Sequence, residues 1–359
     1  MEKKLILIIL LGVVTTTAIV FLLNNKKFEP ALSQTLNALS NSSNSLENEE
    51  VSLYPRVIMP FADLTIPYLR TREYESHLGE LEKYQDHATY TSYLTSYDSD
   101  DLKIKGLLTQ PKGEMPAGGW PAIVFVHGYI PPTIYKTTEK YVEYVDNLAR
   151  NGFVVFKIDL RGNGESEGTP SGAYFSGDYI VDTLNAYTAL QHTEFVNPSR
   201  IGLWGHSMAG NVVLRSFAAK PEIPAVVIWA GAVYSYGDQL KYGINDNSYR
   251  PPTNNAEQQN KRKQLMEQYG QFVVDSPFWK LVAPTNYLND LKGSIQLNHA
   301  TDDTVVNIGY SRDLNSLLDQ TTVPHELNEY PSGGHNITGA SFSKAMSNTV
   351  RFYKQHLAE

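Results

Sequence analysis

A serine on a tight turn is the first residue of this sequence that could do covalent chemistry. The segment RIGLWGHSMAG, residues 200–210, runs from an apolar strand pattern through Gly205 to Ser207. A serine hydroxyl attacks a carbonyl when it projects from a sharp strand-to-helix turn, where backbone amides can hold the oxyanion. Such a turn brings strand and helix together and needs small residues two positions before and after the serine, which are Gly205 and Ala209. The pattern predicts Ser207 as a nucleophile.

The nucleophile needs a base, and the base needs a carboxylate that fixes its tautomer and stabilises the imidazolium. Asp303 in HATDDTVV and His335 in YPSGGHN follow Ser207 in the order serine, acid, histidine. Each comes directly after an expected strand, and open α/β sheets place their sites at the carboxyl ends of strands. Alone, Asp303 could cap a turn and His335 could be an ordinary loop histidine. Their order and placement predict a triad of Ser207, His335 and Asp303.

Acyl transfer also needs backbone amides aimed at the developing oxyanion. The segment HGY begins at His127, directly after the apolar run of residues 120–126. This position predicts the amide of Tyr129 as one oxyanion donor, and the amide of Met208, next to the nucleophile, as the other.

The other histidines compete less well as the base. His206 adjoins the nucleophile and is expected to point elsewhere, and His299 is expected to help build the acid loop. Most of the rest are expected at the surface: His77, His87, His192, His325 and His356. No HExxH or other convincing ligand spacing occurs, so the sequence predicts no catalytic metal.

The composition argues against several classes of partner and site. The 359 residues carry a net charge of -8 without a Lys/Arg cluster in the body of the chain, whereas nucleic-acid binding needs a basic face. The absence of cysteine excludes disulfides, thiolate zinc sites and thiol nucleophiles. The glycines of DLRGNGESEG, residues 159–168, lack the GxGxxG spacing and an immediate helix, so they predict a tight loop rather than a dinucleotide site. No cofactor is expected.

Strand-like and helix-like segments alternate from about Tyr97 to the C-terminus. Apolar runs without polar alternation indicate strands buried on both faces of a parallel sheet, separated by segments with apolar residues at helical spacing. The alternation predicts a doubly wound, mostly parallel α/β sheet around one large core. The expected strands are residues 102–111, 120–128, 152–160, 200–204, 225–231, 294–300 and 325–331, and the expected helices are near residues 141–149, 178–193, 208–220, 311–318 and 342–357.

The alternation stops between the strands at residues 225–231 and 294–300. The intervening residues 232–292 are polar in the middle and carry aromatic side chains near both ends: Tyr234, Tyr236, Phe278 and Trp279. An insertion of this size between core strands is often a cap over an active site. The alternative is that these aromatic side chains only seat a surface excursion on the core.

The first 27 residues differ from all that follow. Leu5–Leu23 is an uncharged run of 19 residues flanked by lysines, long enough to cross a bilayer as a helix. It predicts an uncleaved single-pass anchor with the catalytic domain outside the cytoplasm, because a short basic N-terminal flank favours that orientation. Secretion after signal-peptide cleavage is the alternative, although a small-x-small cleavage site is not evident. Residues 28–50 predict a flexible linker, and residues 51–97 an N-terminal extension of the catalytic domain, residues 51–359.

From about Tyr97 onward the chain resembles the α/β-hydrolase superfamily, and most resembles the catalytic domain of prolyl oligopeptidase-type serine peptidases, the S9 family. The motifs VHGY, DLRGNGES, GHSMAG, HATDDTVV and GGH occur in the family's order. Ala209 and Ala300 stand where the family usually has glycine. Many members carry an N-terminal β-propeller that restricts access to small peptides. Too few residues precede the sheet for a propeller, so a size filter is expected from the cap or the extension.

The resemblance also separates two adjacent carboxylates. Aligned without a gap, HATDD places His299 and Asp303 on the family's histidine and aspartate, and Asp302 on a variable position. Neighbours in an extended loop point to different sides, so only one carboxylate is expected to reach the His335 ring. The resemblance implies that Asp303 is the acid and that Asp302 faces solvent or caps the turn.

Together these features predict a membrane-tethered serine hydrolase that cleaves an ester or amide through an acyl-enzyme. Its expected partners are a small-molecule or short-peptide substrate and the membrane. The resemblance implies a peptidase, and a carboxylesterase with the same triad is the alternative. A third possibility is an inactive hydrolase-fold protein that binds a partner, although loss of activity should first have damaged the triad residues, which are all present.

Overall fold

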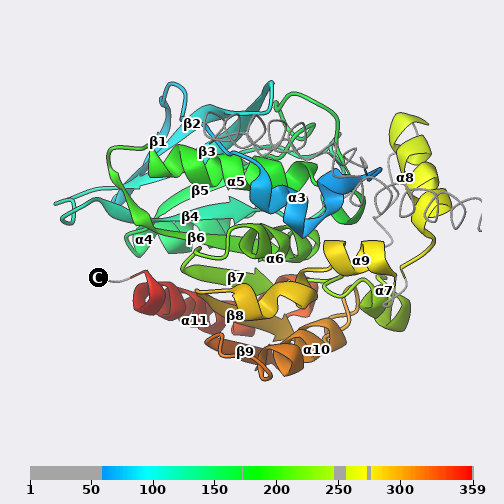
Figure 1. Ribbon diagram of the computed structural model, residues 1–359. Coiled ribbons are helices and arrows are strands. Elements are labelled where there is room, and N and C mark those ends of the chain that lie inside the picture. The colour runs from blue at the N-terminus through cyan, green and yellow to red at the C-terminus, as the bar shows by residue number, and fades with distance from the viewer. Residues whose placement is uncertain (1–58, 172, 246–255, 273–275, 358–359) are drawn as a thin grey trace, which may run out of the picture. The chain divides into compact units, whose positions relative to one another are not determined.

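The alternating segments form one sheet in the computed structural model, which describes residues 59–171, 173–245, 256–272 and 276–357 (Figure 1). Within these residues the sheet has nine strands in the order β1-β2-β3-β5-β4-β6-β7-β8-β9. Pairs among β4 to β9 are parallel, whereas β1, β2 and β3 pair antiparallel and β3 pairs antiparallel with β5. The strands are β1 Glu82–Asp86, β2 Tyr90–Ser99, β3 Leu102–Pro111, β4 Trp120–Val126, β5 Val154–Ile158, β6 Val196–His206, β7 Ala225–Trp229, β8 Ser294–Ala300 and β9 His325–Tyr330.

Helices cover both faces of this sheet (Figure 1). Side chains of α5, α6 and α10 belong to the apolar core on one face, and those of α4 and α11 belong to the core on the other. The prediction of a doubly wound, mostly parallel α/β sheet is therefore confirmed. The α-helices are α3 Ile66–Thr71, α4 Val142–Arg150, α5 Asp178–Gln191, α6 Met208–Ala219, α7 Gly237–Tyr242, α8 Ala256–Tyr269, α9 Pro277–Val282, α10 Gly309–Leu318 and α11 Ala340–His356.

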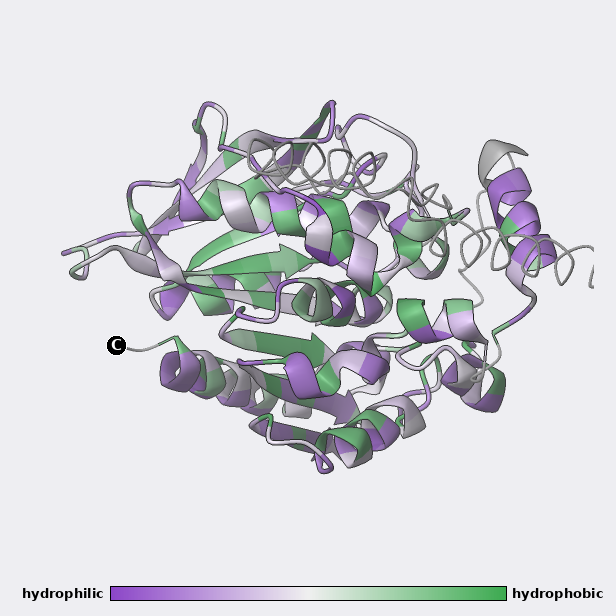
Figure 2. Ribbon diagram, viewed as in Figure 1, coloured by the Kyte–Doolittle hydropathy of each residue, from purple (hydrophilic) through white to green (hydrophobic). Residues whose placement is uncertain are grey.

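Strand β4 shows why the central strands are apolar at every position. Val124 and Val126 lie in the core beneath α5 and α6, whereas Ile123 and Phe125 lie in the core beneath α4 and α11. Successive side chains of a strand point to opposite faces, so a strand covered on both faces favours apolar residues at every position. Figure 2 shows the central strands β4 and β7 largely in green, whereas the helices carry both green and purple residues.

The strand order reverses direction beside β4. The chain passes from β4 to β5 on one side and then returns to form β6 on the other side of β4. In an open α/β sheet, ligands bind at the carboxyl ends of the strands where this reversal leaves a crevice. The loops after β4 and β6, which carry Tyr129 and Ser207, border that point.

Residues 82–99 differ from the sequence prediction. The sequence places residues 51–97 in an extension packed on the main body, whereas β1 and β2 extend the sheet beyond β3. Strand β1 is exposed along its whole length, so it lacks the apolar alternation that would have marked it as a strand. Ahead of these strands, α3 packs against α6, and Arg70 Nε donates a hydrogen bond to the Ala218 carbonyl oxygen at 2.8 Å.

The insertion between β7 and β8 contains α7, α8 and α9, followed by the 3-10 helix η4, Pro284–Asp290. In Figure 1 these helices lie on the side toward which the arrows of β4 and β7 point. The rings of Tyr236, Phe272 and Trp279 are buried together, with centroids 4.6 to 5.4 Å apart. These side chains seat the insertion on the core.

The predicted anchor Leu5–Leu23 and linker 28–50 lie outside the described residues, as does the predicted start of the catalytic domain at residue 51. Among the residues from 59 onward that the structure describes, no helix combines the length and apolar character that crossing a bilayer requires.

Candidate active site

Ser207 lies on the turn between β6 and α6. Its φ of 56° and ψ of -120° belong to a region that residues other than glycine rarely adopt. A Cβ atom on Gly205 would lie 2.6 Å from the Ala209 carbonyl oxygen, so only glycine fits there. The spacing of small residues around the serine thus has a direct steric cause. The turn holds the Ser207 side chain partly exposed at the carboxyl edge of the sheet.

The structure brings the three predicted triad residues together. Ser207 Oγ lies 2.8 Å from His335 Nε2, and His335 Nδ1 lies 2.8 Å from Asp303 Oδ2. A carboxylate only accepts, so Nδ1 carries the proton of a neutral ring and Nε2 accepts from the serine hydroxyl. The arrangement lets the imidazole take up the Ser207 proton while Asp303 faces the resulting positive charge.

Asp303 is buried and held from several sides. Its Oδ1 accepts the backbone amides of Val305 and Val306 at 2.8 and 3.0 Å, and its Oδ2 lies 3.2 Å from His299 Nε2. Burial by itself raises the pKa of the carboxyl group. Hydrogen bonds from His299 and His335 outweigh that effect and hold the pKa of Asp303 well below its usual value. Asp303 is therefore ionised at neutral pH.

His299 lies near the end of β8 and contacts the acid loop, which agrees with the expectation that it helps to build this loop. It is fully buried, and its Nδ1 lies 2.8 Å from Ser311 Oγ while its Nε2 lies 3.0 Å from the Val306 carbonyl oxygen. These contacts fix the loop around Asp303.

Asp302 has a different position from its neighbour. Its carboxylate accepts the amides of Gly333 and Gly334 at 3.2 and 2.8 Å, at the start of the 3-10 turn η5, Gly334–Asn336. Asp302 is exposed, yet it caps the turn that carries His335. Of the two aspartates, Asp303 is the one whose carboxylate contacts the imidazole.

The amides predicted to form the oxyanion hole follow two adjacent strands, β4 and β6. Met208 is the first residue of α6, where backbone amides have no partner within the helix. Tyr129 follows β4, which pairs with β6. The two residues therefore approach the Ser207 turn from the helix and from the neighbouring strand.

A second set of polar side chains links the loop that follows β4 to Asp159, which follows β5. His127 is buried, its Nε2 lies 3.0 Å from the Asp159 carbonyl oxygen, and its ring stacks on Tyr135 with centroids 4.3 Å apart. Its Nδ1 lies 2.7 Å from the Gly128 carbonyl oxygen, and burial lowers the pKa of the ring to about 4. The Asp159 carboxylate accepts hydrogen bonds from Tyr135 and Thr137. The segment DLRGNGESEG thus begins with a structural aspartate, in agreement with its interpretation as a tight loop.

The sequence did not identify the roles of three side chains that hold the site in place: Tyr141, Tyr144 and His206. Asp302 was expected to face solvent or cap the turn, and it caps the turn that carries His335. The Tyr144 hydroxyl donates to the Asn336 carbonyl oxygen at 2.7 Å. The sequence places His206 beside the nucleophile, and its side chain was expected to point elsewhere. Its position next to Ser207 was the only available signal.

A groove of about 820 Å³ lies near the antiparallel end of the sheet. Its lining residues come from the segments around β1, β2 and β3 and from the loops after β4 and β5, and they include Glu82, Lys105, Tyr135 and Glu165. None of its lining residues belongs to the triad.

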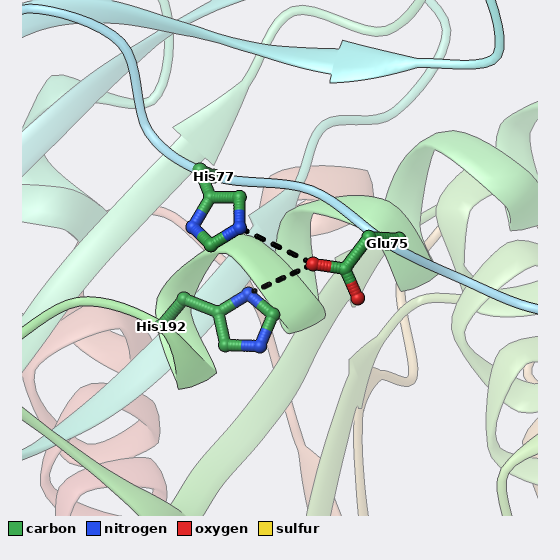
Figure 3. A group of neighbouring side chains, drawn as sticks. All are labelled: Glu75, His77 and His192. Carbon is green, nitrogen blue, oxygen red and sulfur yellow. Dashed lines mark ion pairs between the residues drawn. The ribbon is translucent and has the colours of Figure 1, made fainter.

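Glu75, His77 and His192 form an exposed cluster of potential metal ligands (Figure 3). Glu75 Oε1 lies 3.2 Å from His77 Nε2 and 3.5 Å from His192 Nδ1. The two rings stack with centroids 4.4 Å apart and 22° between their planes, so their in-plane lone pairs do not converge on one point. His192 Nδ1 also lies 2.9 Å from the Ser76 carbonyl oxygen, which requires the proton on that nitrogen. The geometry is that of a carboxylate beside two imidazoles rather than a preformed metal site.

Comparisons with known proteins agree with this fold. Residues 121–248, a span that includes Tyr129 and Ser207 but ends before Asp303 and His335, match the family described as serine aminopeptidase, S33. The uncharacterized peptidase YtmA of Bacillus subtilis is 25% identical over 247 residues, which are 68% of this chain and 85% of that protein. Three further curated relatives are matched over 53%, 41% and 37% of their own length.

Solved structures extend the comparison to most of the described chain. An acetyl xylan esterase from Paenibacillus sp. R4 superposes with a TM-score of 0.60 at 18% identity, covering 81% of this chain and 92% of the esterase. Dipeptidyl peptidase 4 of Porphyromonas gingivalis superposes with a TM-score of 0.55 at 17% identity, covering 75% of this chain and 36% of the peptidase. At these identities the structures show the shared fold. Together with the family match and the peptidase relative, they show that the chain has the α/β-hydrolase fold and is a hydrolase.

Proposed function

We propose that this hydrolase cleaves an ester or amide through an acyl-enzyme formed on Ser207. The observation that carries the proposal is the continuous hydrogen-bonded chain from Ser207 through His335 to Asp303, with both contacts at 2.8 Å. A partly exposed hydroxyl, a base in contact with it and a buried carboxylate behind the base are the parts that nucleophilic acyl transfer requires.

The reaction follows from these contacts. Ser207 Oγ attacks the substrate carbonyl carbon while its proton passes to His335 Nε2, and the carbonyl oxygen becomes an oxyanion held by the amides of Tyr129 and Met208. His335 then gives the proton to the leaving amine or alcohol, and the acyl group remains on Ser207. Water attacks this ester with His335 again as base, the bond to Ser207 Oγ breaks as His335 returns the proton to that oxygen, and the acid product leaves. Asp303 holds the imidazole in the required tautomer throughout.

Peptides are the first candidate substrate class, which would make this hydrolase a peptidase. The matched family is described as a serine aminopeptidase and one relative as a peptidase, which agrees with the resemblance of the motifs to prolyl oligopeptidase-type enzymes. A carboxylesterase is the second candidate, because the triad serves both chemistries and an acetyl xylan esterase has the same fold over most of its length. A panel of aminoacyl anilides and short acyl esters, compared by kcat/KM, distinguishes the two.

A fluorophosphonate probe tests the mechanism itself. The wild-type protein should be labelled on Ser207, and Ser207→Ala should lose both labelling and turnover, with kcat lower by on the order of 10⁶-fold. Ser199→Ala is the matched control, because Ser199 is an exposed serine whose hydroxyl contacts only its neighbour Asn197. Labelling of Ser207→Ala at the wild-type level would refute the assignment of the nucleophile.

The proposed location rests on the sequence. The apolar run Leu5–Leu23 favours a single-pass anchor with the hydrolase outside the cytoplasm. Protease treatment of intact cells should then release an active fragment. Recovery of the full-length protein in the cytoplasmic fraction would overturn this proposal, and recovery of a shortened protein in the medium would favour signal-peptide cleavage.

A further inference from the structure

A chain of hydrogen bonds links the turn of the base to the loop of the proposed oxyanion amide. His206 Nε2 lies 2.9 Å from the His335 carbonyl oxygen, and His206 Nδ1 lies 2.8 Å from the Tyr141 hydroxyl. The same hydroxyl accepts the amide of Gly128 at 2.9 Å. Gly128 directly precedes Tyr129, and His206 directly precedes Ser207. These hydrogen bonds therefore connect the three segments that carry the proposed base, the nucleophile and one oxyanion donor.

The partners in this chain fix where each proton lies. A carbonyl oxygen only accepts, so His206 carries its proton on Nε2 and donates it to His335. The Nδ1 atom of the neutral ring then accepts from Tyr141, whose oxygen is the acceptor for the Gly128 amide. Burial, reinforced by the nearby His335, lowers the pKa of His206 to about 3, so this ring stays neutral at the pH of the reaction. Every donor in the chain has an acceptor.

The local backbone is shaped to allow these contacts. A Cβ atom on Gly128 would lie 2.8 Å from the Tyr141 hydroxyl and 3.0 Å from His206 Nδ1, so a side chain at this position would separate the segments. Tyr141 itself has a φ of 59°, a left-handed conformation that residues other than glycine rarely adopt. Unfavourable backbone geometry of this kind persists where surrounding contacts demand it. Two independent features thus converge on the same three segments.

We propose that His206 and Tyr141 are positioning residues that hold the His335 turn and the Gly128–Tyr129 loop in register with Ser207. Neither side chain exchanges a proton with the substrate. His206 acts through the backbone of the base, and Tyr141 acts through His206 and the Gly128 amide. The inference rests on the proposed acyl-enzyme mechanism, because it assigns a function to the distance between the base and the oxyanion donors.

Replacing His206 with Gln or with Asn tests separately the hydrogen bonds made by its Nε2 and Nδ1 atoms. Gln places a nitrogen at the position of Nε2 and can still donate to the His335 carbonyl oxygen, whereas Asn reaches only as far as Nδ1 and loses that bond. Tyr141→Phe keeps the ring and removes the bridging hydroxyl. Tyr97→Phe is the matched control, since the buried Tyr97 hydroxyl also donates to a backbone carbonyl, that of Asp182 at 2.9 Å, outside the triad.

The measurements are kcat and KM on one ester, the rate of fluorophosphonate labelling, the Tm, and the deshielded NMR proton of the His335 Nδ1–H group. His206→Asn should lower kcat and the labelling rate by on the order of 10- to 100-fold at nearly unchanged KM, because small displacements of catalytic groups are costly. It should also shift or broaden the His335 proton. His206→Gln and Tyr141→Phe should each lower kcat by only about threefold, the effect of one weakened hydrogen bond. Tyr97→Phe should change the Tm but not kcat.

The outcomes separate this inference from the proposed mechanism. If wild-type protein is not labelled at all, the acyl-enzyme mechanism has failed rather than the positioning role. Suppose that wild type is labelled and that His206→Asn lowers the Tm without changing kcat or the NMR signal of the His335 proton. His206 is then merely structural, and the inference is wrong. Equal losses for His206→Gln and His206→Asn would also overturn it. If His206→Asn does not fold, wild-type kcat in folded Tyr141→Phe overturns the coupling.

Discussion

Two groups of buried polar side chains lie at the loops that follow the parallel strands, and they serve different ends. In the first, Asp303 supports the partly exposed pair of His335 and Ser207. In the second, Arg161 binds Asp182 through its side chain, with nitrogen to oxygen distances of 2.7 to 3.1 Å. Both groups contain a fully buried aspartate side chain, which contacts the Arg161 guanidinium in one group and the His335 imidazole in the other.

The two groups differ in what contacts the nitrogen-bearing side chain on the side away from the buried aspartate. Arg161 is surrounded by carboxylates, because Asp100 and Asp178 lie 3.1 and 3.5 Å from its guanidinium in addition to Asp182. The triad instead ends in a hydroxyl on a backbone turn with an unusual φ. A buried ion pair alone is therefore weak evidence for a site, since structural networks perturb charges in the same way. The triad differs because its last member, Ser207, is partly exposed and has an unusual backbone conformation.

The two groups also shift aspartate pKa values in opposite directions. Hydrogen bonds from two histidines hold the pKa of Asp303 low despite its burial. Burial dominates at Asp182, whose pKa is raised although Arg161 opposes the shift. Burial likewise raises the pKa of Asp159 to about 6, against the opposing effect of Lys157. The balance between desolvation and hydrogen bonding to the charged form decides the sign.

The largest expected effect separates the two aspartates by activity. Asp303→Asn should lower kcat by about 10⁴-fold, because the amide favours the wrong tautomer of His335. Its Tm should change little, since an amide oxygen can still accept the Val305 and Val306 amides. Steady-state kinetics on an ester, with calorimetry on the same preparation, measure both quantities. A kcat within tenfold of wild type would remove Asp303 from the mechanism.

The second effect should appear in stability instead. Asp182→Asn should lower the free energy of unfolding by about 3 kcal/mol, because it leaves buried Arg161 without its closest partner. Asp100 and Asp178 remain nearby and limit the loss. Urea unfolding measures this change, and kcat of the folded variant should stay within about twofold of wild type. A stable variant with a large loss of kcat would instead place Arg161 and Asp182 in the active site.

The third effect tests the opposite pKa shifts. The folded protein retains a proton on Asp159 between its usual pKa of 3.8 and about 6, whereas the unfolded chain releases it. Its contribution to stability is therefore fully present below the usual pKa and is lost as pH rises through about 6. Compared with Asp159→Asn, wild type should gain on the order of 2 kcal/mol in unfolding free energy from pH 6 to pH 4. Wild type compared with Asp303→Asn should lose stability over the acidic range, and the same sign for both variants would contradict this account.

The smallest effect concerns the neighbour of the triad acid. Asp302→Asn should lower kcat about fivefold, corresponding to about 1 kcal/mol for a weakened hydrogen bond to the Gly333 and Gly334 amides. The family resemblance implied only that Asp302 faces solvent or caps the turn. Comparison with Asp303→Asn on one substrate checks both assignments, and a larger loss at Asp302 would reverse them.

The amino-acid sequence by itself determined the fold class and singled out Ser207 and His335, and the family resemblance chose Asp303 over Asp302. Apolar runs such as β4 indicate strands of a sheet covered on both faces, and Ser207, Asp303 and His335 each come directly after an expected strand. The edge strand β1 was not predicted, because its side chains are exposed and leave no periodic signal.

Tertiary structure decided the contacts that cross between loops. Asp302 meets Gly334, and His206 meets the backbone of His335, across separations of 32 and 129 residues, which no local pattern encodes. A hydrogen bond depends on where the folded backbone brings a donor and an acceptor, and a carbonyl oxygen has no side-chain identity to read from the sequence. The residues that perform the proposed chemistry were thus visible in the sequence, whereas those that hold them in place became visible only once the sheet had brought its loops together.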